Sequence, residues 1–130
     1  MTVELLVLAL AVLLAALQVC VLSVVANLTM PTRWLVGPRD EPRELPRKVG
    51  RLNRAYENHL QGLVMFTAAV IVVEGAGRTS DLTATAALVY LGARVLYVPA
   101  YVAGVPWVRS LIWAVGFLAT VVMVAAGLAG

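Results

Sequence analysis

The feature that constrains this chain most is an uncharged segment that runs from Leu5 to Thr32. A helix needs about 20 residues to cross the hydrocarbon core of a bilayer, so this segment is long enough to span a membrane. No basic region precedes it, Glu4 stands at its start, and it is far longer than the apolar part of a cleavable signal peptide. We therefore predict a retained membrane helix over about residues 3–30.

Three further segments have the length and apolar character of membrane helices. The 62% share of hydrophobic residues and the mean hydropathy of +0.91 lie well above the values of soluble domains, whose apolar share is about 45–50%. We predict an all-α integral membrane protein, a four-helix bundle that forms one domain over residues 1–130. Its helices are expected at about 3–30, 51–74, 82–103 and 106–128.

A proline-rich and basic stretch separates the first two predicted helices. Prolines at positions 31, 38, 42 and 46 exclude a continuous helix, so residues 31–50 are predicted to form a loop. Residues 33–54 hold seven of the ten basic residues of the chain. Basic residues beside membrane spans mark the cytoplasmic side, so we expect this loop in the cytoplasm and both termini on the opposite side. We interpret the basic cluster as a topology signal and predict no nucleic-acid partner.

Polar residues line one side of the second predicted helix. Arg54, Asn58 and Gln61 are spaced i, i+4 and i+7, so they stack along one face of the helix. His59 points about 100° away from Asn58 and does not belong to this face. The uncharged part of the helix, residues 58–73, extends only about 24 Å. The polar turn is therefore expected at or inside the cytoplasmic interface.

The third predicted helix repeats this pattern with Tyr90, Arg94, Tyr97 and Tyr101. Arg94 lies about ten residues from the end of the helix, or about 15 Å deep in the membrane. An unpaired arginine at that depth costs at least about 2.5–3.5 kcal/mol. Arg94 is therefore expected to point into the bundle or into an interface between subunits.

The two polar faces are expected to meet, because these helices run in opposite directions and their polar residues lie at similar depths. Arg109 and Ser110, at the start of the fourth helix, would join them at the cytoplasmic mouth. Guanidinium, carboxamide and tyrosine hydroxyl groups together suit an anionic, peptide-like ligand. The alternative is that these residues only hold the helices together, as polar groups do in membrane bundles.

The same residues carry a resemblance to a known family. The run Arg54-Ala55-Tyr56-Glu57-Asn58-His59-Leu60-Gln61, followed by Phe66, resembles the helix 2 signature of the MAPEG superfamily, the membrane-associated proteins in eicosanoid and glutathione metabolism. The segment "ARVLYVPAY", with Arg94, Tyr97 and Tyr101, is similar to its helix 3 pattern, and Arg109-Ser110 resembles the Arg-Ser pair that follows. At motif level the resemblance covers about residues 50–112.

The resemblance implies a membrane-bound glutathione S-transferase or peroxidase-like protein that acts on lipophilic electrophiles. It further implies a homotrimer surrounded by membrane lipids, with glutathione as co-substrate between subunits near the cytoplasmic side. Arg109 would be the catalytic residue that stabilises the thiolate. Gln61 departs from the family pattern, which has a glutamate there. The remaining residues that we assign to the ligand pocket are Arg54, Asn58, Gln61, Arg94, Tyr97, Tyr101 and Ser110.

Two other functions stay open at this point. One is a non-catalytic family member that binds a lipid or another ligand, which the glutamine at position 61 favours. The other is a small four-helix proton-coupled transporter, which needs a carboxylate deep in the membrane, whereas Glu4, Glu57 and Glu74 all lie near helix ends. We predict no metal, because no set of histidine, cysteine and carboxylate residues has ligand spacing.

Overall fold

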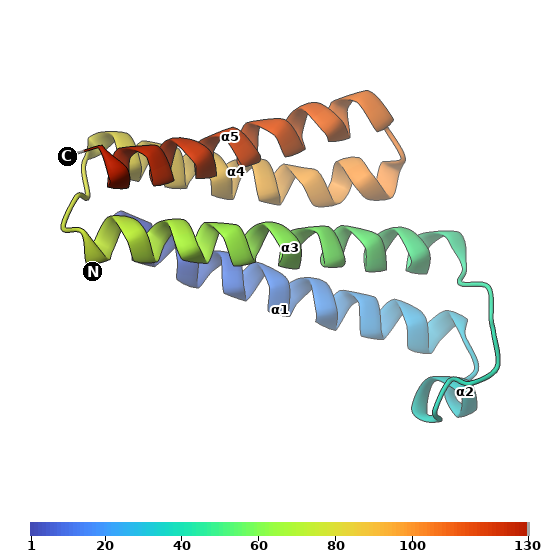
Figure 1. Cartoon of the computed structure of the whole chain (residues 1–130). Helices are drawn as coiled ribbons and strands as arrows, with labels where there is room; N and C mark the ends of the chain where they lie inside the picture. The colour runs from blue at the N-terminus through green and yellow to red at the C-terminus, as the bar shows by residue number, and fades with distance from the viewer. Residues whose placement is uncertain (130) are drawn as a thin grey trace.

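The computed structural model describes residues 1–129, which form helices and no strands. Four long helices, α1 (Val3–Thr29), α3 (Arg47–Gly75), α4 (Asp81–Ala103) and α5 (Pro106–Leu128), run up and down along one bundle, and a short helix, α2 (Thr32–Val36), lies at one end (Figure 1). Each long helix has the length and composition to cross a membrane. The predicted all-α, four-helix, multi-pass membrane protein is confirmed.

The long helices pack as a four-cornered bundle in which α3 and α4 are the central pair. Each of these two contacts all the other long helices, whereas α1 and α5 do not contact each other within residues 1–129. The start of α1 and the end of α5 lie at the same end of the bundle, which we call the terminal end (Figure 1). The end with α2 and the long loop is called the loop end. Central helices are the elements best placed to build a site.

The bundle places small side chains inside and large apolar side chains outside. On α1, Ala11 and Ala15 are buried, while Leu13 and Leu17 are each more than 60% exposed. Lipid tails are as apolar as leucine, so a membrane bundle gains little by hiding large aliphatic groups. It gains instead from the close approach that small residues permit. The exposed leucines are therefore the surface of a membrane protein.

The centre of the bundle is an aromatic pair. Phe66 of α3 and Tyr90 of α4 are both buried and stack with their ring centroids 4.0 Å apart and their planes 2° from parallel. Gly116 of α5 faces this pair, and a Cβ atom there would lie 3.5 Å from the Cβ of Ala93. The glycine lets α5 approach α4 closely, which brings three helices together around Tyr90.

Polar contacts fasten the terminal end. The hydroxyl of Thr2 donates to Glu74 of α3, and the buried carboxylate of Glu4 accepts from the hydroxyl of Thr83 on α4. Ser80 and Thr83 form a reciprocal capping box at the start of α4. Glu4 is thus used to hold the start of α1 between its neighbours.

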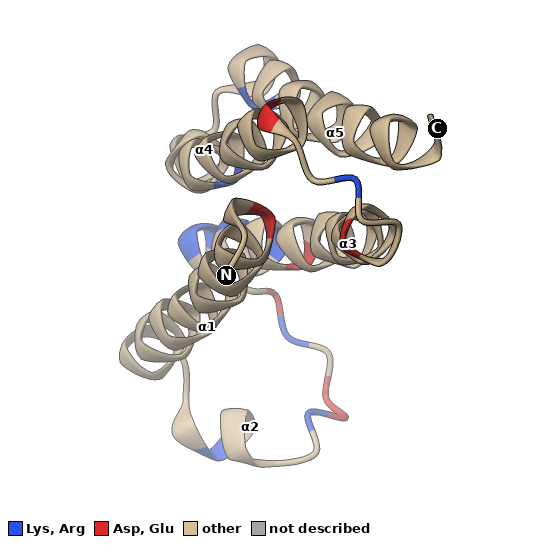
Figure 2. Ribbon diagram, turned by 90° about the vertical axis from the view of Figure 1, so that its left-hand side faces the viewer, with Lys and Arg blue, Asp and Glu red and all other residues tan. Residues whose placement is uncertain are grey.

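The segment predicted as a loop over residues 31–50 differs from this expectation at both ends. Helix α2 occupies residues 32–36, and α3 begins at Arg47 rather than at Arg51. Pro31 and Pro46 immediately precede these helices, and proline is compatible with a helix start even though it breaks a helix interior. The irregular part is residues 37–46, which carries charges of both signs (Figure 2).

A tight turn at the loop end joins α4 to α5 and holds the end of α4 close to the start of α5. Gly104 ends α4 in the left-handed region at φ 75°, and its N–H bonds back to the carbonyls of Ala100 and Tyr101. The guanidinium of Arg51, on α3, donates to the carbonyl of Val102 at 3.0 Å. Three helices are therefore held together where Tyr101 and Arg109 approach each other.

Candidate functional site

Seven side chains from three helices surround a cavity of about 360 Å³ at the loop end of the bundle. We call it the arginine–tyrosine pocket. Helix α3 presents one side of it through residues about one turn apart, as the spacing in the sequence predicts. Six of the eight predicted site residues line it, and Glu57 is added by the structure. The lining residues are Arg54, Glu57, Asn58, Gln61, Tyr97, Tyr101 and Arg109.

Tyr101 joins the two arginines of the pocket. The Nε of Arg54 donates to the Tyr101 hydroxyl at 3.0 Å. The guanidinium carbon of Arg109 lies 4.7 Å from the centroid of the Tyr101 ring, within the range of a cation–π interaction. One tyrosine of α4 therefore orients a cation from α3 and a cation from α5, and both guanidinium groups keep donors for a ligand.

Glu57 and Gln61 form the α3 side of the pocket, one helical turn apart. Both side chains are exposed. Glu57 accepts a hydrogen bond from the amide of Asn53 at 3.4 Å and forms no ion pair within residues 1–129. It is the one carboxylate among the residues that line the pocket. The sequence interpretation considered Glu57 as a replacement for the family glutamate but expected it to pair with Arg54 or with solvent, and therefore left it outside the site.

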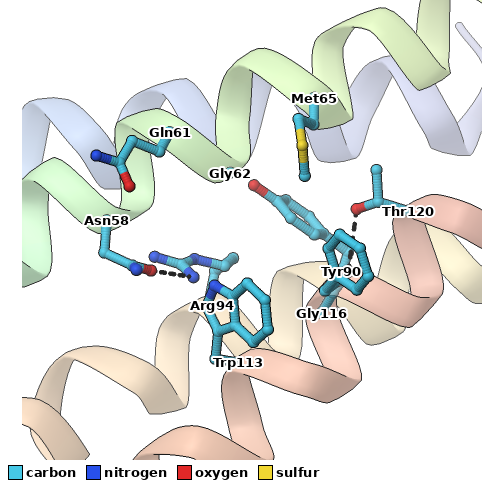
Figure 3. A pocket seen from close by; sticks show the side chains of 10 residues that line it. Asn58, Gln61, Gly62, Met65, Tyr90, Arg94, Trp113, Gly116 and Thr120 are labelled. Carbon is cyan, nitrogen blue, oxygen red and sulfur yellow. Dashed lines mark hydrogen bonds between the residues drawn. The ribbon is translucent and has the colours of Figure 1, made fainter.

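Arg94 points into the bundle but lies deeper than the arginine–tyrosine pocket and does not line it. Its side chain is 3% exposed, and its Nη1 donates to the Oδ1 of Asn58 at 2.9 Å. Its guanidinium carbon lies 4.6 Å from the centroid of the Tyr97 ring. Arg94 occupies the amide oxygen of Asn58 (Figure 3), and the NH₂ group of Asn58 makes no hydrogen bond within residues 1–129, so it remains available as a donor. Arg94 thus orients a pocket residue.

His59 is a second residue that the sequence interpretation left outside the polar cluster. It was placed off the polar face, yet it is fully buried and accepts a hydrogen bond from the Nε of Arg94 at its Nδ1, 3.3 Å away. Its Nε2 lies 2.8 Å from the carbonyl oxygen of Ala11 on α1. A carbonyl only accepts, so Nε2 carries the proton and Nδ1 has the lone pair that Arg94 needs. The need of a deep arginine for more than one acceptor was the signal that could have identified it.

Ser110 lies beside the pocket rather than in it. With Asn58, Tyr97, Arg109 and Trp113 it lines a smaller cavity of about 140 Å³. Asn58, Tyr97 and Arg109 border both cavities. Arg109 and Ser110 therefore share the smaller cavity, and only Arg109 also lines the arginine–tyrosine pocket.

The arrangement suits an anionic ligand better than a metal. The pocket is lined by two guanidinium groups, two carboxamide side chains and two tyrosines. Guanidinium groups bind carboxylates with paired hydrogen bonds. Within residues 1–129 no group of three histidine, cysteine or carboxylate residues is placed to hold a metal ion. The chemistry available is recognition of carboxylates and stabilisation of a developing anion.

These features define a small integral membrane protein with four membrane-spanning helices and a cation-rich cavity between three of them. The sequence matches the model of the MAPEG family over residues 7–129, nearly the whole chain. The chain belongs to the MAPEG family, and the resemblance predicted from Arg54, Asn58 and the helix 3 pattern is confirmed. Neither the curated proteins nor the solved structures contain a significant match to this sequence.

Proposed function

We propose that the protein binds glutathione in the arginine–tyrosine pocket and uses its thiolate to attack lipophilic electrophiles or peroxides, as a membrane-bound glutathione transferase or peroxidase. The observation that carries this proposal is the charge pattern of the pocket. Two guanidinium groups and one carboxylate surround about 360 Å³ of space. Glutathione has the complementary pattern of two carboxylates, one ammonium group and peptide amides.

The carboxylates of glutathione fit the two arginines. Arg54 uses its Nε for Tyr101, so its two terminal nitrogens remain for a carboxylate. The guanidinium of Arg109 lies over the same ring and makes no hydrogen bond within residues 1–129, so its N–H groups remain for the second carboxylate. The free NH₂ of Asn58 supplies a donor for a peptide carbonyl.

The ammonium group of glutathione fits the α3 side of the pocket. Gln61 occupies the position of the family glutamate and provides a neutral amide oxygen. Glu57, one turn earlier, provides the negative charge, and no arginine or lysine within residues 1–129 neutralises it. In this chain the carboxylate that pairs with the ammonium group is therefore on Glu57, one helical turn before the position of the family glutamate.

Arg109 has the role of thiolate stabiliser. A thiol with a pKa of about 8.5 is mostly protonated at neutral pH, and a guanidinium group beside it favours the nucleophilic anion. The thiolate then forms a thioether with an electrophilic carbon, while the bond to the leaving group breaks and that group departs with the electron pair. With a peroxide the thiolate attacks one oxygen, the O–O bond breaks and the alcohol leaves, and a second glutathione reduces the sulfenic acid to give glutathione disulfide and water. The lipophilic reaction partner arrives from the bilayer, because the pocket lies between membrane helices.

We further propose that the loop end faces the cytoplasm and that three copies assemble around the site. The loop end carries most of the basic residues, in agreement with the positive-inside rule. The large apolar surface of α1 and α5 is available for lipid and for neighbouring copies. Crosslinking followed by mass analysis should give a trimer, and a monomer in a mild detergent would contradict this assembly.

The second candidate function is a non-catalytic member that binds a lipid or another anionic ligand in the same pocket. Gln61 favours this function, because the family glutamate is absent from its usual position. The two functions differ in one measurable property. A transferase must form a glutathione thiolate, and a binding protein need not.

The deciding experiment is calorimetry of glutathione binding to the protein purified in a non-ionic detergent, with thiolate formation followed by ultraviolet difference absorbance. Arg109→Ala should remove the thiolate signal and conjugation but leave the assembly intact. Arg43→Ala, in the irregular loop and outside the pocket, is the matched control and should behave like the unaltered protein. No binding at millimolar glutathione would refute the transferase function.

A further inference from the structure

A groove of about 540 Å³ runs between α1 and α3 at the loop end, and α2 adds to its walls. We call it the α1–α3 groove. It contains no residue of α4 or α5 and none that lines the arginine–tyrosine pocket. Its α1 side is a stripe whose members are spaced alternately three residues and one residue apart, so they share one face of the helix. The α1 stripe consists of Val19, Leu22, Ser23, Ala26, Asn27 and Met30.

The walls of the α1–α3 groove are mostly apolar. They include the buried cluster of Ala26, Met30 and Val49. Two amides also line the groove, but their NH₂ groups are already bonded. Asn27 donates to the carbonyl of Ser23 at 2.7 Å, and Asn53 donates to the carboxylate of Glu57 at 3.4 Å. An occupant of the groove is therefore expected to be apolar over most of its length.

A second cavity, of about 490 Å³, adjoins the groove at Trp34 and Arg39, which line both spaces. We call it the loop cavity. Asp40 and Glu41 line it, together with three exposed arginines that form no ion pair in the described part of the chain, residues 1–129. The three are Arg33, Arg39 and Arg43. The lining therefore has a net positive charge, and its guanidinium groups are free to bind an anion.

Hydrogen bonds hold the loop cavity in shape. The indole Nε1 of Trp34 donates to the carbonyl of Glu41 at 3.0 Å. Arg39 adopts the left-handed conformation at φ 58°, and its Nε and Nη2 donate to the carbonyl of Leu35 at 3.1 and 2.9 Å. This conformation is unfavourable for a residue with a side chain, and such residues gather at ligand sites. The Nη1 of Arg39 has no hydrogen-bond partner among residues 1–129 and keeps its donors for a ligand.

The two spaces lie at different depths of the membrane. Helix α2 begins three residues after α1 ends, so the loop cavity lies at the membrane interface, where tryptophan is enriched. The α1 stripe extends from residue 19 to residue 30, about 16 Å along the helix, so the groove reaches from the interface toward the middle of the span. A ligand that fills both spaces has an anionic head at the interface and a hydrocarbon chain inside the bilayer.

We propose that the loop cavity and the α1–α3 groove together bind one anionic phospholipid from the leaflet at the loop end. Arg33, Arg39 and Arg43 donate hydrogen bonds to its phosphate, and one acyl chain lies along the α1 stripe. The groove has the volume of a pocket for one small ligand, so the second chain stays in the bilayer. No residue of the arginine–tyrosine pocket takes part, and the lipid site is independent of glutathione binding.

The fluorescence of Trp34 reports on this site, because Trp34 lines both spaces. Trp107→Phe combined with Trp113→Phe leaves it as the one tryptophan of the chain. This protein is placed in phosphatidylcholine vesicles with increasing fractions of a phospholipid brominated near the head of one acyl chain, since bromine quenches tryptophan on contact. Brominated phosphatidylglycerol should reach half-maximal quenching at an about fivefold lower mole fraction than brominated phosphatidylcholine, the ratio for one arginine beside an anionic lipid. Equal quenching by the two lipids would overturn the proposal.

The charge of the loop cavity is tested by Arg33→Gln combined with Arg43→Gln, which leaves the hydrogen bonds of Arg39 in place. The preference for phosphatidylglycerol should fall below about twofold. Arg47→Gln with Lys48→Gln is the matched control, since it removes two exposed charges from the same end of the bundle outside both spaces, and it should keep the preference. An equal loss in this control would assign the preference to general surface charge and overturn the proposal, as would an unchanged preference in the first variant.

The place of the acyl chain is tested by Ser23→Phe. Ser23 is an exposed member of the α1 stripe, and phenylalanine there fills part of the groove. The mole fraction of brominated phosphatidylglycerol at half-maximal quenching should rise at least about threefold, the change expected when one methylene group loses its place. Val24→Phe is the matched control, because Val24 is exposed on the same helix and does not line the groove. Equal quenching curves for these two variants would place the chain elsewhere and overturn the proposal.

Discussion

Replacing Glu57 by glutamine tests whether the proposed glutathione site has moved its negative charge by one helical turn. Glu57 is the one carboxylate that lines the arginine–tyrosine pocket, and it has no ion-pair partner within residues 1–129. Glutamine keeps the size of the side chain and removes the charge. The variant should therefore fold and assemble normally, and its effect should appear only when a ligand with a positive group is bound.

The magnitude follows from the exposure of Glu57. Opposite charges 4 Å apart near a protein surface attract by about 4 kcal/mol at an effective dielectric constant of about 20. Glu57 is exposed, so solvent screening and side-chain ordering reduce the net value to about 1 kcal/mol. This energy corresponds to an about fivefold higher Kd of the Glu57→Gln variant for glutathione.

The assay is a comparison of two ligands on two proteins by calorimetry. Glutathione carries the ammonium group, and N-acetylglutathione lacks its charge. Glu57→Gln should weaken glutathione about fivefold and leave N-acetylglutathione unchanged, so the coupling between residue and ligand isolates the ammonium contact. Adding Gln61→Glu to this variant should restore the affinity. An equal loss for both ligands, or no loss for glutathione, would refute the assignment of Glu57.

Two further predictions concern stability, measured as the free energy of unfolding in a denaturing-detergent titration followed by tryptophan fluorescence. His59→Leu removes the acceptor of Arg94 Nε and should lower this free energy by about 1–3 kcal/mol; an unchanged midpoint would mean that the hydrogen bond contributes nothing. Gly104→Ala should cost about 1–2 kcal/mol, because φ is 75° and the new Cβ would lie 2.9 Å from Arg51. In an Arg51→Ala background, which lacks the contact, Gly104→Ala should still lower the free energy of unfolding. If it no longer does, the whole cost comes from the clash with Arg51 and none from the backbone conformation.

The membrane helices could be predicted from the sequence because hydropathy and turn residues report directly on membrane crossing. The start of α3 could not be predicted in this way, because Arg47 to Val49 are helical but lie before the apolar stretch and carry no hydropathy signal. A helix continues into water as long as its residues tolerate the conformation, and proline then sets its first residue. Helix α2, five residues between two prolines, could not be predicted either, because it also lies outside the apolar stretches.

The polar faces were predictable as faces because helical periodicity fixes which side chains share one side of a helix. The pairing of Arg94 with His59 was not, because a single-helix projection says nothing about a partner reached across the bundle. The contribution of Ala11 is invisible in any sequence, since it is made by a backbone carbonyl. Tyr90 was assigned to the same face as Arg94, but only the packing of Phe66 determines where its hydroxyl points.

The hydrogen bonds that Arg94 donates to His59 and that His59 donates to the Ala11 carbonyl also have a consequence for biogenesis. The ribosome makes a chain from its N-terminus, so α1 and α3 are synthesised before α4. The acceptors of Arg94, on Asn58 and His59, therefore precede it into the bilayer. The order of synthesis supplies partners for the one guanidinium that lies deep in the membrane before that charge arrives, which lowers the barrier to inserting the third span.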